Sequence, residues 1–275
     1  MPDEKQTLAL SFIHEEPELA AKILEKSDIA ELAGFLQSIP SDYQNILLRN
    51  MLPFYSSKVC IYLGADEAAG LLADLEVTAL AKILRNLPKN DKARILDKYS
   101  ANIKNACNLL LRFSSQSIGA WMRPVFASIT SDMTVAEVLS HLKKTPEEVY
   151  ADFVYIIDRN GKLAGRITSL DLLKANKKFL ALDIAEKNTP LISANMLLEQ
   201  VAELSIWEKS DVVSVIDMNE QFLGVLKHAD LRIGLKEVNK APSEQADSSD
   251  LVSGILEVYG KTLLVLFSTV MNVIE

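Results

Sequence analysis

The chain has 275 residues, 49% of them hydrophobic and 24% charged, a composition that allows one large or two moderate globular domains. Its formal net charge of −8 disfavours nucleic acid as a partner, because neutralising phosphate requires clustered Lys and Arg. With only Cys60 and Cys107, a disulfide scaffold is excluded, and both thiols are expected to be buried and reduced. The N-terminus lacks the basic and then apolar layout of a signal peptide, which predicts a cytoplasmic chain.

The first part of the chain reads as a helical domain, assigned to residues 1–115. Apolar residues recur there at helical spacing, and strand-like alternation is absent. The pattern is interrupted at Pro17, Pro40, Pro53, Gly64 and Pro88. Ser41 followed by Gln44 fits a capping box after one of these breaks. We expect short helices stacked in pairs as a superhelix, whose hand the sequence does not specify.

The acidic residues of this helical part allow two interpretations. They lie on a solvated helix face, or a few of them face carboxylates of the second half and are bridged by a hard divalent cation such as Mg²⁺. For the second interpretation, Asp91 and Asp97 are the candidate metal ligands.

Residues 130–235 contain one segment twice. Gly165 recurs as Gly224 and Asp171 as Asp230, 59 positions later in each case (224 − 165 and 230 − 171). Each copy predicts a helix, a strand, a tight turn, a strand and a second helix. Two such copies pack as a pseudo-symmetric pair, and we expect a ligand to bind in the cleft between them.

In the first copy, Thr134 and Glu137 form a capping box that opens the first helix. A buried strand at 153–157 and a return strand at 163–167 flank Asn160-Gly161, which predicts a two-residue hairpin turn. The second helix starts within 168–171. The second copy predicts a helix over 195–206, strands over 212–216 and 222–226, and a helix from Ala229. The front end of the second copy lies 63 positions after that of the first (193 − 130), whereas the back ends lie 59 apart. The four extra residues of the first copy are assigned to 145–148.

The sequence at 165–171, Gly-Arg-Ile-Thr-Ser-Leu-Asp, resembles the CBS module, in which Gly-x-apolar-Ser/Thr-x-x-Asp closes the second strand. The resemblance implies an adenosine nucleotide (ATP, ADP or AMP), with the Thr168 hydroxyl on phosphate and the Asp171 carboxylate on the ribose hydroxyls. The second copy keeps the Gly and the Asp but has Lys227 in the hydroxyl position. The nucleotide-binding candidates are Gly165, Arg166, Thr168, Asp171, Lys227 and Asp230.

Two of these residues also have a reading without a ligand. Thr-x-x-Asp at a helix start is itself a capping box, and Arg166 is either a phosphate contact or a solvated strand residue. A lysine at 227 neutralises phosphate or fills the site.

The order of helices, a linker at 117–124 and a CBS pair resembles the cytosolic part of MgtE-type magnesium transporters. Ser117, Gly119, Met122 and Pro124 match that family's linker motif. The resemblance implies a homodimer through the CBS modules and Mg²⁺ bound between carboxylates of the domains. At 229–233, where the family is acid-rich, this sequence reads Ala-Asp-Leu-Arg-Ile.

The C-terminal part is expected to be a polar linker and one helix, apolar around most of its circumference. Such a helix needs burial, either in a dimer-spanning bundle or against a lipid surface or a protein or membrane-protein partner through 251–275. No segment reaches the roughly 18 to 20 apolar residues that span a bilayer.

Together these patterns predict an α+β chain with an all-helical N-terminal superhelix, a tandem CBS pair and a C-terminal helix. The domains are expected at 1–115, 116–178 (CBS motif one), 179–240 (CBS motif two), 241–249 (linker) and 250–275 (helix). No catalytic motif is present, so an enzyme is not expected. The expected function is a cytosolic regulator that senses Mg²⁺, an adenine nucleotide or both. The alternatives are a dimeric adaptor without a ligand and the cytosolic fragment of a magnesium transporter.

Overall fold

The computed structural model describes residues 4–124, 128–144 and 153–239. The chain divides into two compact units at Cys107, and each is described by itself. None of the helices described has the length and hydropathy needed to cross a bilayer. The predicted C-terminal helix at 250–275 and the loop at 145–148 lie outside the described residues.

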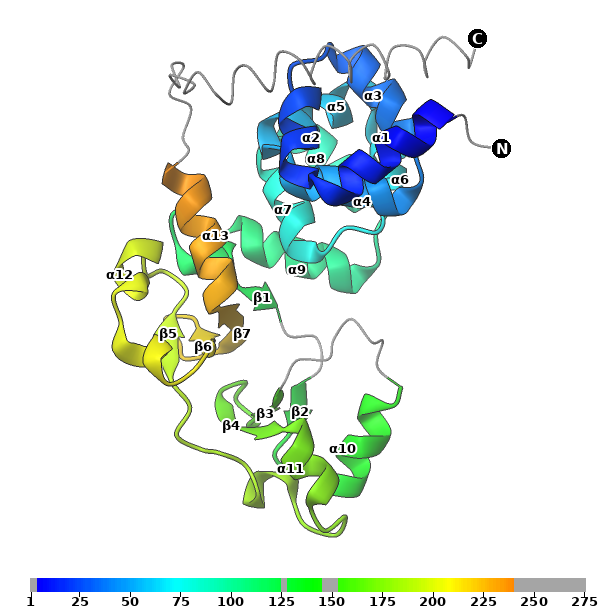
Figure 1. Ribbon diagram of the computed structural model, residues 1–275. Coiled ribbons are helices and arrows are strands. Elements are labelled where there is room, and N and C mark those ends of the chain that lie inside the picture. The colour runs from blue at the N-terminus through cyan, green and yellow to red at the C-terminus, as the bar shows by residue number, and fades with distance from the viewer. Residues whose placement is uncertain (1–3, 125–127, 145–152, 240–275) are drawn as a thin grey trace. The chain divides into compact units, whose positions relative to one another are not determined.

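The first unit is built from short helices (Figure 1). They are α1 (Glu4–Glu15), α2 (Pro17–Leu24), α3 (Ile29–Ser38), α4 (Ser41–Asn50), α5 (Pro53–Leu63), α6 (Ala65–Leu71), α7 (Val77–Arg85), α8 (Lys89–Leu96) and α9 (Ala101–Leu111). The predicted breaks are confirmed, since α2 and α5 begin on a proline, α4 and α8 follow one, and Gly64 turns the chain with φ +79° before α6.

Helical periodicity correctly predicts side chains that lie in the core of this unit. Leu32, Leu36, Leu80 and Leu84 are buried, as their spacing predicts. The predicted capping box at Ser41 is wrong, because α4 already begins at Ser41 with Pro40 in the cap position. The Gln44 side chain instead donates to the carbonyl oxygen of Ile39 at 2.9 Å.

Both cysteines are buried and unpaired with each other, as predicted. Desolvation by burial raises the pKa of the Cys60 thiol from 9.0 to about 12, and burial does the same for Cys107. Both groups are therefore neutral thiols at physiological pH.

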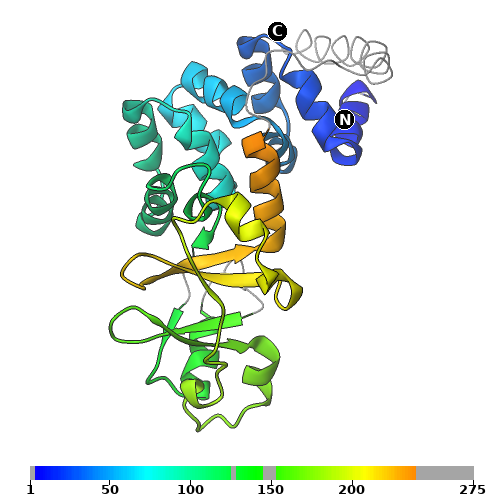
Figure 2. The ribbon, with the colours of Figure 1, turned by 90° about the vertical axis from the view of Figure 1, so that its left-hand side faces the viewer.

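The second unit holds two small sheets with their helices (Figures 1 and 2). The first copy contains β2 (Ser128–Thr130), α10 (Val135–Leu142), β3 (Phe153–Ile157), β4 (Leu163–Thr168) and α11 (Ser169–Lys174). The second contains β5 (Leu191–Ser193), α12 (Leu198–Ala202), β6 (Val212–Ile216), β7 (Phe222–Lys227) and α13 (His228–Asn239). Strand β1 (Arg123–Pro124) and two 3₁₀ turns, η1 (Ile118–Ala120) and η3 (Ala181–Asp183), precede the copies.

The sheets have the orders β2-β3-β4 and β1-β7-β6-β5. In each copy a parallel pair is followed by an antiparallel hairpin, and the register shifts at Ile156/Ile157 and again at Val215/Ile216, 59 positions later (215 − 156). The core of the first copy lies between its sheet and its helices, where Ile129, Val138, Ile156 and Leu172 pack together.

The segment that precedes each copy, η1 in one case and η3 in the other, forms backbone hydrogen bonds with the other copy. The Ile118 amide donates to the Met196 carbonyl at 2.9 Å, and the Ala181 amide donates to Met133 at 2.9 Å. Donors and acceptors are both 63 positions apart (181 − 118 and 196 − 133), so the exchange is reciprocal. The sequence repeat therefore extends further towards the N-terminus than residue 130.

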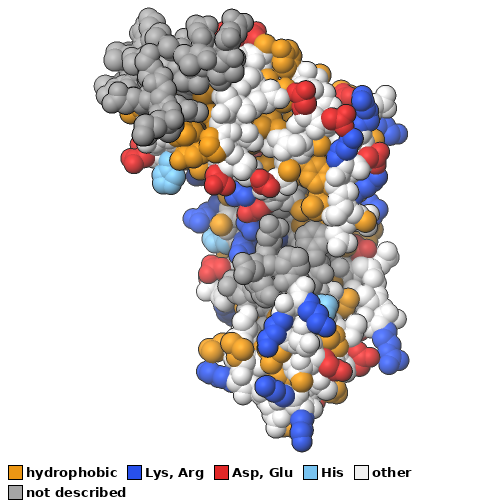
Figure 3. All heavy atoms as spheres, turned by 90° about the vertical axis from the view of Figure 1, so that its right-hand side faces the viewer, with side chains coloured by type: hydrophobic (Ala, Val, Ile, Leu, Met, Phe, Trp, Pro, Cys, Tyr) orange, Lys and Arg blue, Asp and Glu red, His pale blue; other side chains and the backbone are white. Residues whose placement is uncertain are grey.

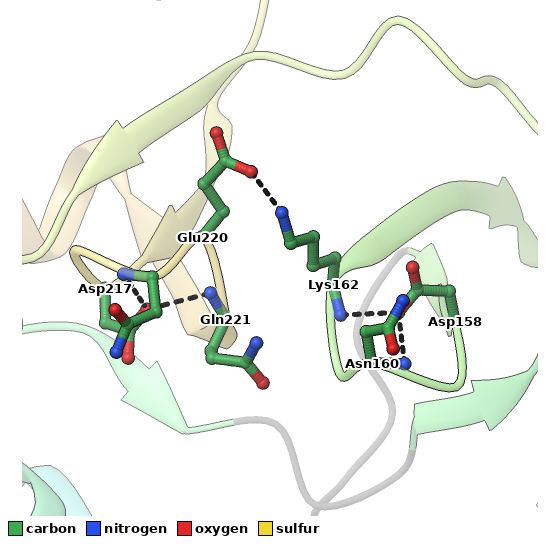
Figure 4. A network of polar contacts seen from close by, with 7 residues as sticks. Asp158, Asn160, Lys162, Asp217, Glu220 and Gln221 are labelled. Carbon is green, nitrogen blue, oxygen red and sulfur yellow. Dashed lines mark hydrogen bonds and ion pairs between the residues drawn. The ribbon is translucent and has the colours of Figure 1, made fainter.

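The two hairpin loops are also joined to each other (Figure 4). The Asp158 carboxylate accepts from the amides of Asn160 and Lys162, and Asp217 does the same 59 positions later. Lys162 forms an ion pair with Glu220 across the copies. The predicted two-residue turn is wrong, because the Asp158 amide bonds to the Lys162 carbonyl and encloses a three-residue loop with Gly161 at φ +79°.

Two further predictions concern helix boundaries. The capping box of Thr134 and Glu137 is confirmed, with α10 starting after Thr134. The helix expected over 195–206 is shorter, since α12 ends at Ala202 and the chain continues as a 3₁₀ turn, η4 (Ser205–Glu208). The indole of Trp207 donates to the Val201 carbonyl at 2.7 Å, which folds this turn back onto α12.

Candidate functional site

The predicted nucleotide-binding residues lie where the second strand of each copy runs into its second helix. We call the positions in the first copy half-site one (Gly165, Arg166, Thr168 and Asp171). The matching positions in the second copy are half-site two (Gly224, Lys227 and Asp230).

In half-site one, Thr168 is the N-cap of α11. Its Oγ1 accepts from the Asp171 amide at 3.0 Å and donates to Asp171 Oδ2 at 2.6 Å. Both polar groups are thus satisfied by each other, as the capping-box reading predicts. Asp171 is exposed to solvent, so a ligand with hydroxyl groups can reach it.

Arg166 is buried, with 7% of its surface exposed, and the reading of a solvated strand residue is wrong. Its Nε donates to Glu186 Oε2 at 2.8 Å, and its guanidinium carbon lies 4.2 Å from the centre of the Phe153 ring. One terminal nitrogen lies 3.5 Å from the Val212 carbonyl oxygen of the second copy. Arg166 therefore joins the two copies.

The glycines of both half-sites allow close approach of backbone. A Cβ atom on Gly224 would lie 2.3 Å from the Arg123 carbonyl oxygen on β1. On Gly165 it would lie 3.0 Å from the Ala185 Cβ. The backbone packing around Gly224 is thus tighter than that around Gly165. Strand β1 pairs with β7 at two positions, whereas a single bridge between Arg166 and Glu186 lies at the edge of β4.

In half-site two, the Asp230 carboxylate is held by Arg123. Nε donates to Oδ2 at 2.6 Å and a terminal nitrogen donates to Oδ1 at 2.9 Å, a bidentate arrangement. The Asp230 side chain is 14% exposed. Lys227 is half-buried at the end of β7, where it pairs with Val212.

The surface between the two sheets is filled by aromatic and aliphatic side chains. Tyr155 stacks on Phe222 with ring centroids 5.2 Å apart, and Val212 and Val225 complete the cluster. Ser214, at the position that matches Tyr155 (214 − 155 = 59), is buried, and its hydroxyl has no hydrogen-bond partner among the described residues.

The predicted metal ligands, Asp91 and Asp97, both lie at α8, one in its first turn and the other as its C-cap. Asp97 forms an ion pair with Lys104. Across the ranges 4–124, 128–144 and 153–239, no three His, Cys, Asp or Glu side chains gather closely enough to hold a metal ion.

Sequence reasoning missed Arg123 and Glu186, the residues that pair with Asp230 and Arg166. They are 63 positions apart and occupy matching places, since Arg123 lies opposite Val225 and Glu186 opposite Arg166 in the two sheets. The sequence held one signal for this correspondence, the spacing of 63 positions between the front ends of the two copies. Applied to residue 123, this spacing leads to residue 186.

The chain is similar to known magnesium transporters over most of its length. Residues 15–116 match the MgtE intracellular N domain, and residues 118–178 match the CBS domain. The magnesium transporter MgtE of Thermus thermophilus is 22% identical over 242 residues, which cover 82% of this chain and 54% of the relative. That of Bacillus subtilis is 22% identical over 234 residues, 83% and 49% of the two chains. The chain thus spans about half the length of these curated relatives.

Two solved structures share the fold. The soluble part of a magnesium transporter has a TM-score of 0.56 and 22% identity, and it covers 86% of this chain and 99% of its own. The cytosolic domain of the Mg²⁺ channel MgtE in complex with ATP has a TM-score of 0.55 and 20% identity, with 82% and 98% covered. In domain order, this chain thus matches an MgtE intracellular N domain followed by a CBS domain, and it shares the fold of the soluble part of a magnesium transporter.

Proposed function

We propose that this chain is a regulatory unit of magnesium transport or homeostasis that senses an adenine nucleotide, Mg²⁺ or both. The observation that carries the proposal is the intact half-site one, Thr168 and Asp171 at the start of α11, in a CBS pair that follows an MgtE N domain. The role is regulatory rather than catalytic, and its compartment is the cytoplasm.

The nucleotide is proposed to bind at half-site one. The Thr168 hydroxyl would contact a phosphate oxygen, and the Asp171 carboxylate would accept from two ribose hydroxyls. Both groups would exchange their mutual hydrogen bonds for bonds to the ligand. Gly165 and Arg166 support the site indirectly, through contacts with the 185–186 segment. A solved relative of this fold contains ATP, which supports the ligand class.

Mg²⁺ is proposed to bind at carboxylates of the helical unit. Asp91 and Asp97 would supply one or two oxygens, and water the rest, as is usual for this ion. Asp97 would have to release Lys104. The names of the curated relatives, both magnesium transporters, support the choice of ion.

A homodimer through the CBS pair is the proposed assembly. On α11, Leu170 is 58% exposed and Leu173 71% exposed, and Phe179 beyond the helix is also exposed. Large side chains so exposed on one short stretch are typical of a contact surface. The segment 251–275 is proposed to contact a protein or a membrane-protein partner.

The test measures the unfolding temperature of the purified chain with ATP, AMP, MgCl₂ or EDTA. At a hundredfold excess over Kd, a ligand adds about 2.7 kcal/mol to the folded state. We expect a nucleotide shift that Thr168→Ala/Asp171→Ala removes, and a Mg²⁺ shift that Asp91→Asn/Asp97→Asn reduces. Both variants are first compared with wild type without ligand, since Thr168 also caps α11.

A dimeric adaptor that binds no small ligand is the second candidate. The mutual satisfaction of Thr168 and Asp171 favours it, because neither group needs a ligand. Absence of any shift with nucleotide and Mg²⁺ would contradict the sensor and leave the adaptor. Because the chain spans about half of its curated relatives, the cytosolic part of a transporter stays a third reading, which the full gene sequence decides.

A further inference from the structure

The two half-sites differ in what holds their acidic residue. Asp171 is exposed and bonded to a neutral hydroxyl. Asp230 is bonded at both oxygens to the Arg123 guanidinium, which comes from 107 residues earlier in the chain. Ribose hydroxyls are neutral donors, so they cannot replace a charged, bidentate partner at equal strength.

Backbone packing fixes Arg123 in this place. Strand β1 pairs antiparallel with β7, with Arg123 opposite Val225 and Pro124 opposite Gly224. The missing side chain of Gly224 lets the Arg123 carbonyl approach to a distance that no Cβ atom would permit. The guanidinium is therefore delivered to Asp230 by a paired strand, not by a freely moving loop.

The matching position in the first copy has the opposite charge. Glu186 lies there, 63 positions after Arg123, and pairs with Arg166 on β4. A carboxylate at this position cannot pair with the Asp171 carboxylate, and Glu186 contacts Arg166 instead. The same fold position thus leaves half-site one accessible and covers half-site two.

We propose that Arg123 is an internal occupant of half-site two, which limits the chain to one adenosine nucleotide, bound at half-site one. Removal of the guanidinium opens a second site, in which Asp230 binds the ribose hydroxyls and the Lys227 ammonium binds phosphate. The inference rests on the proposed binding mode at half-site one, extended to its pseudo-symmetric counterpart.

The test is calorimetric titration of the full chain with ATP, and separately with AMP, at fixed salt concentration. We expect one nucleotide per chain for wild type and two for Arg123→Ala. Arg123→Ala/Asp230→Ala should return to one, and Arg123→Ala/Thr168→Ala/Asp171→Ala should keep only the new site. Arg94→Ala, which removes an exposed arginine of the helical unit, is the charge-matched control and should stay at one.

Two sites in wild type, or no additional site in Arg123→Ala, would overturn the proposal. If wild type binds no nucleotide and Arg123→Ala binds one, the function proposed for half-site one fails while the role of Arg123 stands. Arg123→Gln keeps a hydrogen-bonding side chain of similar length without the charge, and it serves if the alanine variant does not fold. Gain of a site in this variant supports the proposal, and no gain contradicts it.

Discussion

Single charged residues link distant parts of the second unit. Arg166 is buried against the Phe153 ring and reaches the backbone of the other copy, while its partner Glu186 is half exposed. A buried guanidinium that loses its carboxylate keeps only the Phe153 ring and the Val212 carbonyl oxygen as partners, which is destabilising. The position of Arg166 in a strand could be predicted, but its burial could not, because burial depends on how the second copy packs.

Glu137 gives a pH-dependent contribution to stability at the residue scale. The backbone amide of Thr134, and then its hydroxyl, hold the pKa of this carboxyl below its ordinary value of 4.5. A folded pKa below the unfolded one means that the stabilisation is complete above about pH 4.5 and is lost as pH falls through the folded pKa.

We therefore predict that Glu137→Gln weakens the fall in unfolding free energy between about pH 5 and pH 3. Urea unfolding at several pH values measures this slope. Glu199→Gln is the matched control, since Glu199 lies in the first turn of α12 in the second copy. A slope unchanged in Glu137→Gln would show that the cap carboxylate does not contribute.

At the scale of elements, the smallest strand closes an exposed sheet edge. Strand β1 has two residues and pairs with Gly224 and Val225 at the edge of β7. An uncovered edge presents free backbone amides and carbonyls and favours aggregation. The sequence did not reveal β1, because a strand of two residues leaves no alternation to detect.

Substituting the two repeat glycines tests how tightly each edge is covered. We predict that Gly224→Ala lowers the free energy of unfolding by about 2 kcal/mol or more, because backbone atoms of β1 must move. Gly165→Ala, the matched control, should cost less, since its new Cβ would lie 3.0 Å from the Ala185 Cβ and 3.1 Å from the Glu186 carbonyl oxygen, against 2.3 Å from the Arg123 carbonyl oxygen at Gly224. Urea denaturation compares the two variants, and equal losses would contradict the prediction.

At the scale of the whole molecule, charged and hydrophobic side chains share the surface. Figure 3 shows Lys, Arg, Asp and Glu side chains interspersed with hydrophobic ones over one face.

If the CBS pair forms a dimer through α11, Leu173→Glu should turn it into a monomer, while Lys174→Glu on the same helix should change association less. Light scattering during gel filtration measures the mass, and a dimer in Leu173→Glu would contradict this assembly.

Much of this architecture could be predicted from the sequence, because duplication, proline breaks and hairpin signals are local features. The helical part, both hairpins and the Thr168 cap are of this kind. Pairings between residues more than 100 positions apart, such as Arg123 with Asp230, have no local signal. The loop at Gly161 differed from the expected turn because Asp158 accepts two amides and draws the chain into a wider loop.

The reciprocal exchange of leading segments has a consequence for how the chain can be divided. A fragment of residues 118–178, which match one CBS domain, would not contain Ala181, whose amide donates to Met133. It would also lack Met196, whose carbonyl accepts from Ile118 in η1. Each copy expressed alone would therefore have orphaned backbone amides and aggregate. The duplicated segment encodes two copies, but we expect the smallest piece that folds by itself to be the entire second unit, 108–241.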